Sequence, residues 1–151
     1  GEWVVLPGHL FSLGELDNRS PDVWTSGPVT VRSWPMAHTK SSIGYRVETP
    51  GGTAVAYSGD TGPCGELVEL ARGADLFLCE CSLPDGMKIE GHLTPSEAGA
   101  AAAAAGVRRL VLTHFYPECD AADIAAQCRL TWQGPLTLAE DLMEIRISPA
   151  R

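Results

Sequence analysis

The sequence predicts an α/β domain (α+β in some classification schemes) in which a mixed sheet is covered by helices on one face. Strand patterns dominate the first third of the chain, and strands alternate with helices in the remainder. The clearest helix start, at Thr94 and Pro95, stands between two apolar strands. The length of 151 residues and the hydrophobic fraction of 44% are typical of one globular domain, so we treat residues 1–151 as a single domain.

The first predicted strands follow a stretch of turn-forming residues. Residues 1–28 have no clear period and predict short strands and loops at most. Between residues 29 and 34 apolar and polar side chains alternate, as they do in a half-buried strand. Residues 43–49 and 53–58 form the next two predicted strands, and residues 50–52, Pro-Gly-Gly, predict a tight hairpin turn between them.

Helices and strands alternate after this hairpin. The first predicted helix covers residues 63–72 and stops at Gly73. Thr94 is a suitable N-cap for the second helix, Glu97 completes a capping box, and six alanines continue the helix to Gly106. The remaining predicted elements are strands at 75–79, 109–113, around 136–138 and at 143–147, and a helix at 120–131.

Composition limits the classes of partner. A formal net charge of −8 argues against binding nucleic acid through a broad basic surface. No apolar stretch approaches the roughly 18 residues that a membrane span needs, so we expect no membrane partner. The five cysteines, an odd number, indicate reduced and buried thiols in a cytoplasmic protein.

Five ionisable side chains stand at the ends of predicted elements. His38, Asp60, Glu80 and His114 each come at or just after a strand, and His92 precedes the capped helix. Polar groups at the ends of neighbouring strands converge on one edge of a sheet, and two histidines with an aspartate can bind a divalent metal. Taken singly, each also has a structural explanation: a hydrogen-bonding histidine, a turn aspartate or a solvated carboxylate.

Taken in order, these segments resemble metallo-β-lactamase-fold hydrolases, and most of all the ribonuclease Z-like branch. The resemblance runs from about residue 29 to about residue 116. It implies that the chain forms half of an αββα sandwich. The segments that carry it are His38, Gly44-Tyr45-Arg46, Tyr57-Ser58-Gly59-Asp60-Thr61, Glu80, Gly91-His92-x-Thr94 and Leu112-Thr113-His114-Phe115.

The resemblance implies a role for each of the five side chains. His38 would be a ligand of the first metal, Asp60 would bridge two metals, and His114 would be the last ligand of the second. The complete site would hold two Zn²⁺ ions, with Mn²⁺ or iron as alternatives, and would use a metal-bridged hydroxide to hydrolyse a phosphodiester. Glu80 and His92 resemble the pair that transfers a proton to the leaving group.

The chain also departs from the family pattern. The His-x-His-x-Asp-His run, which supplies ligands to both metals, is absent, and His9 stands alone in a predicted loop. We therefore expect the chain to be the C-terminal portion of a metallo-β-lactamase-fold domain. Residues 47–57 leave room only for a hairpin where long-arm ribonuclease Z enzymes insert an arm that clamps transfer RNA. Cys79 stands where the family has a histidine before Glu80.

Several functions therefore remain open. The leading interpretation is a metal-dependent phosphodiesterase; RNA stays an open substrate that the charge disfavours, and a homodimer stays an open assembly. The second is a hydrolase of another small ester in the same superfamily. The third is a non-catalytic piece or assembly partner without a full metal site, and the fourth is an α/β domain whose histidines are structural.

Overall fold

The computed structural model describes residues 15–147, which contain one seven-stranded sheet with its strands in sequence order. The strands are β1 (Asp22–Ser26), β2 (Val29–Pro35), β3 (Ile43–Glu48), β4 (Ala54–Tyr57), β5 (Leu76–Glu80), β6 (Leu110–Thr113) and β7 (Leu136–Leu138). The α-helices are α1 (Gly65–Ala71), α2 (Pro95–Ala105) and α3 (Ile124–Cys128), and short 3₁₀ helices cover Asp85–Met87 and Pro117–Ala121. Within these residues no helix has the length and apolar character to cross a membrane.

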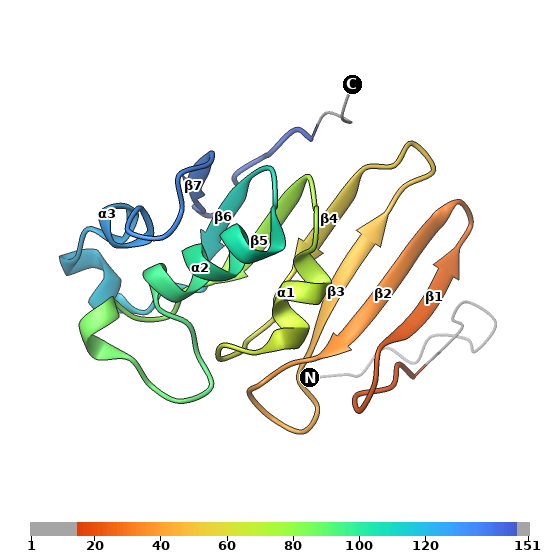
Figure 1. The fold of residues 1–151 in the computed structure, drawn as a ribbon, viewed down its shortest axis with the longest axis horizontal. Coiled ribbons are helices and arrows are strands. Elements are labelled where there is room, and N and C mark those ends of the chain that lie inside the picture. Colours follow the sequence, from red (N-terminus) through yellow and green to blue (C-terminus); the bar gives the residue numbers. More distant parts are fainter. Residues whose placement is uncertain (1–14, 148–151) are drawn as a thin grey trace, which may run out of the picture.

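The sheet is mixed, as the sequence predicts. Strands β1 to β4 pair antiparallel, and β4 to β7 pair parallel. Two adjacent parallel strands need a crossover connection, and α1, α2 and α3 supply the three connections in turn. The helices lie in a layer over one face of the sheet (Figure 1).

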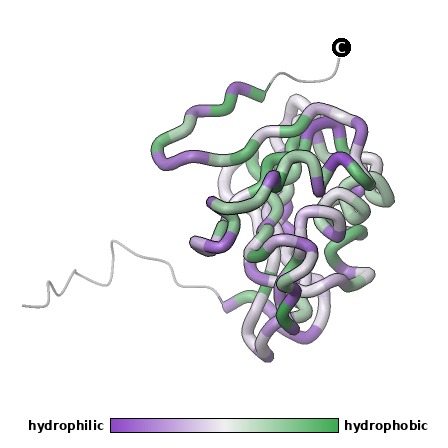
Figure 2. The backbone as a smooth tube through the Cα atoms, turned by 90° about the vertical axis from the view of Figure 1, so that its left-hand side faces the viewer, coloured by the Kyte–Doolittle hydropathy of each residue, from purple (hydrophilic) through white to green (hydrophobic). Residues whose placement is uncertain are grey.

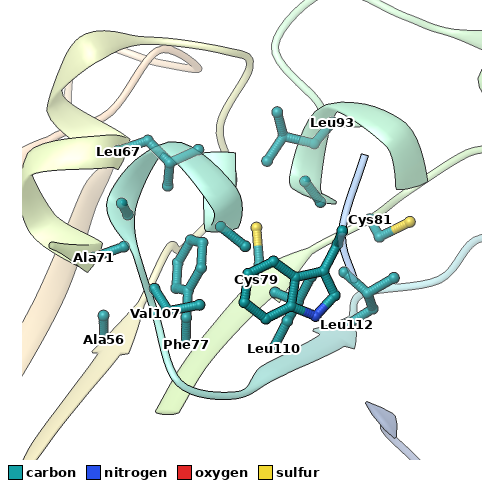
Figure 3. Packing of buried hydrophobic residues seen from close by; sticks show 14 of the residues in the cluster. Ala56, Leu67, Ala71, Phe77, Cys79, Cys81, Leu93, Val107, Leu110 and Leu112 are labelled. Atoms are coloured by element: carbon teal, nitrogen blue, oxygen red, sulfur yellow. The ribbon is translucent and has the colours of Figure 1, made fainter. Parts of the chain in front are cut away.

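The hydrophobic core lies between this helical layer and the sheet (Figure 3). Phe77, Leu110 and Leu112 point toward the helices from the parallel strands, and they belong to the same buried cluster as Leu67 and Leu70 of α1. All five side chains are fully buried. Small side chains let α2 approach the sheet closely, since its buried residues are alanines, one glycine and Pro95.

Both ends of α2 form as predicted. The backbone N–H of Thr94 donates to Oε2 of Glu97 at 3.1 Å, which is one half of the capping box. Gly106 ends the helix with a φ of +64°, a left-handed conformation that glycine adopts without a steric cost.

The predicted elements near the C-terminal end differ from the structure. The predicted helix at 120–131 is shortened to α3, because Ala122 is extended and Asp123 starts a new helix by accepting the Ala126 N–H at 2.8 Å. The predicted strand at 143–147 does not form. Figure 2 shows this part of the chain looping out from the body of the protein. Arg146 and Ile147 then line a cavity with Asp75 and Leu76 at the start of β5 without joining the sheet.

The opposite face of the sheet carries apolar side chains that no helix covers. Directly opposed residues of antiparallel strands share a face, and the pairs Val31–Val47 and Tyr45–Tyr57 point away from the helices. Tyr57 is 41% exposed, and the other three are partly buried. One layer of helices on one face of a sheet is half of the expected αββα sandwich.

The cysteines are free, and four of the five are buried, as predicted. Burial raises the pKa of the Cys128 thiol to about 11, and it raises the pKa of the Cys79 thiol as well. Such thiols stay protonated and act as small apolar packing groups.

Gly44 is required where β3 passes β4 and α1. A Cβ at this position would lie 2.8 Å from the carbonyl oxygen of Ser58 and 3.0 Å from that of Tyr57. Backbone atoms of a central strand cannot move away without breaking the sheet, so the Gly-Tyr-Arg segment begins with glycine for a steric reason.

We predict that Gly44→Ala lowers the free energy of unfolding by about 1–3 kcal/mol, the cost of overpacking a filled core. Urea denaturation followed by circular dichroism measures this change. The matched control is Gly65→Ala at the start of α1, where a Cβ would meet nothing within 4 Å. Equal stability of the two variants would contradict the steric explanation.

Candidate active site

The polar residues singled out in the sequence gather at one edge of the sheet. Strands β2, β4, β5 and β6 run in the same direction, so they all end at this edge. His38 and Asp60 lie three residues beyond β2 and β4, Glu80 is the last residue of β5, and His114 directly follows β6. His92 reaches the same edge from the turn before α2.

Glu80 and His92 form a buried pair. Nδ1 of His92 lies 2.9 Å from Oε1 of Glu80, and their side chains are only 9% and 1% exposed. The pair orients the imidazole, because a ring bonded through Nδ1 directs Nε2 to the opposite side. Within the described part of the chain, Nε2 of His92 makes no hydrogen bond and is free to act on another molecule.

The Glu80 carboxylate accepts four hydrogen bonds, two at each oxygen. Oε1 accepts from the backbone N–H of Thr61 at 2.8 Å and from His92, and Oε2 accepts from the Ser82 hydroxyl at 2.9 Å and the Leu93 N–H at 3.1 Å. A buried carboxylate is stable only when donors replace its lost water. Glu80 is therefore an internal anchor, and its interpretation as a solvated strand-end carboxylate is wrong.

His38 lies beside His92 and is oriented by the backbone. Its Nδ1 lies 3.1 Å from the carbonyl oxygen of Gly91, and the centroids of the two imidazole rings are 4.7 Å apart. Gly91 has a φ of +84°, and a Cβ there would lie 2.9 Å from Nδ1 of His38. The glycine before His92 thus makes room for His38 in addition to allowing the turn.

His114 also lies beside His92, and Asp60 lies beside His114. The ring of His114 stacks on that of His92 at a centroid distance of 5.6 Å, and Nε2 of His114 lies 3.5 Å from Oδ1 of Asp60. His114 has a φ of +64°. A left-handed conformation is uncommon at residues other than glycine, and it persists only where the surrounding structure holds it. Residues of this kind are concentrated at functional sites.

The geometry around a metal is present only in part. Two ligand atoms bound to one tetrahedral zinc at about 2.1 Å lie roughly 3.4 Å apart, and the separation of Asp60 and His114 is close to this value. His38 does not join them, since residues 15–147 hold no group of three His, Cys, Asp or Glu side chains placed to bind one ion. His9 lies outside the described residues.

Two residues of this site were missed by the sequence reasoning. Ser82 touches both members of the Glu80–His92 pair, and the only signal in the sequence is its position two residues after Glu80. The ring of Tyr116 lies 5.8 Å from that of His92 and 5.6 Å from that of His114. Its place depends on the chain direction after β6, which the sequence pattern does not encode.

Comparison with known proteins identifies the family. The model of the beta-lactamase superfamily domain matches residues 14–115. The protein Rv1339 of Mycobacterium tuberculosis is 42% identical over 126 residues, which cover 81% of this chain and 46% of Rv1339. Ribonuclease Z of Salinispora arenicola is 41% identical over 107 residues, which cover 66% of this chain and 34% of that enzyme.

Solved structures share the architecture. The metallo-β-lactamase-fold protein YhfI of Bacillus subtilis aligns with a TM-score of 0.71 and 25% identity over 79% of this chain and 50% of its own. The short form of human tRNase Z aligns with a TM-score of 0.65 and 30% identity over 83% of this chain and 46% of its own. The chain thus spans less than half the length of the curated relatives it matches. It belongs to the beta-lactamase superfamily and is a metallo-β-lactamase-fold, ribonuclease Z-like protein.

Proposed function

We propose that the full-length protein is a metal-dependent hydrolase that cleaves a phosphodiester. The observation that carries this proposal is the buried Glu80–His92 pair, placed at the sheet edge that also presents His38, Asp60 and His114. Histidines with only structural roles would not have to gather at one edge of the sheet together with two carboxylates. The ribonuclease Z relatives favour a phosphodiester over other esters.

His38, Asp60 and His114 would be ligands in a site of two metal ions, with Zn²⁺ the first choice and Mn²⁺ or iron the alternatives, and all three would not bind one ion together. Imidazole nitrogen and carboxylate oxygen are suitable donors for each of these ions. Bound divalent ions supply an activated water at neutral pH and stabilise negative charge on the phosphoryl oxygens. The short separation of Asp60 and His114 supports their sharing one ion.

Glu80 and His92 would manage the proton that the leaving group needs. Glu80 holds Nδ1 of His92, so a proton on Nε2 can be donated to the departing oxygen as the bond to phosphorus breaks. The negative carboxylate stabilises the positive imidazolium before transfer. Because the pair is buried, this interaction is little weakened by water.

A small phosphodiester is the substrate that fits this chain best. The turn between β3 and β4 spans only residues 49–53, so there is no arm at this point to clamp a transfer RNA. The net charge of −8 also disfavours a long polyanion. Another small ester, and RNA itself, are the alternatives that the assay below separates.

We further propose that a second layer covers the open face of the sheet in the full-length protein. The apolar pairs Val31–Val47 and Tyr45–Tyr57 favour a packed neighbour, since contiguous apolar side chains that reach the surface can mark contact sites. This layer would carry the remaining metal ligands. The alternative is that the protein is a non-catalytic part of an assembly. Burial of the open face without binding of metal would favour this alternative.

Cytoplasmic location and pairing into a homodimer remain predictions.

The test is hydrolysis by the full-length protein. With added Zn²⁺ or Mn²⁺ we expect it to cleave bis(4-nitrophenyl) phosphate and a cyclic or linear dinucleotide, and to lose this activity with a chelator. Release of nitrophenol and chromatography of the nucleotides measure the rates. Cleavage restricted to carboxyl or sulfate esters would contradict a phosphodiesterase, and cleavage of transfer RNA precursors alone would favour RNA.

We predict that His38→Ala, Asp60→Ala and His114→Ala each lower kcat/KM about a hundredfold or more, because loss of a ligand removes the nucleophile. Each variant should also retain less metal after gel filtration, as measured by elemental analysis. The matched control is Glu69→Ala, which removes an exposed carboxylate of α1 that pairs with Arg72. If the histidines are only structural, activity stays within a few-fold of wild type.

We predict that Glu80→Gln destabilises the fold by about 1–3 kcal/mol and lowers kcat, because either orientation of the amide points its NH₂ group at two donors. Chemical denaturation and steady-state kinetics measure the two effects. Wild-type stability of this variant would contradict the hydrogen bonding described for the carboxylate.

A further inference from the structure

Ser82 contacts both members of the Glu80–His92 pair. Its side chain is fully buried. The hydroxyl oxygen lies 2.9 Å from Oε2 of Glu80 and 2.9 Å from Nδ1 of His92. The hydroxyl therefore touches both groups at once, on the side of the imidazole that faces the protein interior.

The proton positions in this triangle follow from counting donors. The single hydroxyl proton of Ser82 is donated to Oε2 of Glu80, so the hydroxyl oxygen can only accept from His92. His92 must then carry a proton on Nδ1, which it shares between the Ser82 oxygen and Oε1 of Glu80. Two acceptors on one N–H fix the plane of the ring more firmly than one, and they leave Nε2 on the reacting side.

Three backbone contacts hold Ser82 itself in place. Its N–H donates to the carbonyl oxygen of Leu93 at 3.1 Å, and its carbonyl oxygen accepts from the Tyr116 N–H at 3.0 Å and the Cys119 thiol at 3.3 Å. These partners come from the segment before α2 and from the segment after β6. Ser82 thus connects the two chain segments that carry His92 and His114.

A serine, a histidine and an acidic residue in contact resemble the side chains of a serine hydrolase, but the arrangement excludes that chemistry. In such a triad the acid and the serine bond opposite nitrogens of the ring. Here Ser82 and Glu80 both face Nδ1 of His92, and the hydroxyl is buried and fully hydrogen-bonded. Ser82 is not placed to attack a substrate.

We propose that Ser82 is a positioning residue that holds His92 in the orientation needed to protonate the leaving oxygen. This inference rests on the proposed phosphodiesterase activity. Under this inference, Ser82 affects the rate at which the leaving group departs and does not affect the affinity for the substrate. A general acid matters most when the leaving group is a poor one, because a stable anion departs without a proton.

The experiment compares two leaving groups in the full-length protein loaded with Zn²⁺ or Mn²⁺. We expect Ser82→Ala to lower kcat about tenfold or more on a dinucleotide, whose leaving group is an alkoxide, with KM nearly unchanged. On bis(4-nitrophenyl) phosphate the same variant should lose less than about threefold, since nitrophenolate needs no proton. Ser82→Thr, which keeps the hydroxyl, should recover most of the dinucleotide rate.

Two controls separate positioning from a structural effect. Ser33→Ala removes another fully buried hydroxyl, one without a hydrogen-bond partner in the described structure, and should leave both rates unchanged. In a His92→Ala background, Ser82→Ala should cause no further loss on the dinucleotide, because both substitutions remove the same step.

Each outcome decides the inference. Equal losses on the two substrates, failure of Ser82→Thr to recover the rate, or additive losses with His92→Ala would overturn the role of Ser82 while leaving the phosphodiesterase intact. Absence of any phosphodiester cleavage by the wild-type protein would overturn the proposed function, and the role of Ser82 with it.

Discussion

The arrangement of the site depends on one buried carboxylate. Glu80 ends strand β5 and accepts hydrogen bonds from the turn after β4, from the residues beyond its own strand and from the segment before α2. Hydrogen bonds to a charged group contribute about 1.5–3 kcal/mol each, and leaving such a group unsatisfied costs more. The three segments are therefore held together by the same group that orients His92, so folding of this edge and assembly of the site are one process.

The sheet topology explains why the other residues meet there. Because α1 and α2 return the chain to the start of each parallel strand, Asp60, Glu80 and His114 leave the sheet at the same edge. The antiparallel hairpins leave β2 running in the same direction as these strands, so His38 also leaves the sheet at that edge. Glycines then allow the close approaches: Gly44 lets β3 pass β4 and α1, and Gly91 admits the ring of His38.

The two faces of the sheet serve different purposes. The helical face is closed and forms a complete core with small residues on α2 and large ones on the strands. The open face presents apolar pairs, and one of their members, Tyr57, ends β4 three residues before Asp60, so the second layer proposed above would reach this end of the sheet. Under this proposal, stability within the described chain and completion of the metal site would depend on opposite sides of one sheet.

Most of the helices and strands could be predicted from the sequence, because strand alternation, the Thr94 cap and the glycine stops are local signals. The five polar residues could be singled out because they stand at the ends of those predicted elements. The sequence could not determine that Glu80 is buried, since a carboxylate at a strand end is normally solvated, and only the donors from distant segments reverse that. It also missed Ser82 and Tyr116 and overextended the helix at 120–131, where the Asp123 side chain interrupts the pattern. The strand predicted at 143–147 does not form for a related reason: alternating side chains do not specify a pairing partner, and this segment pairs with none of the seven strands.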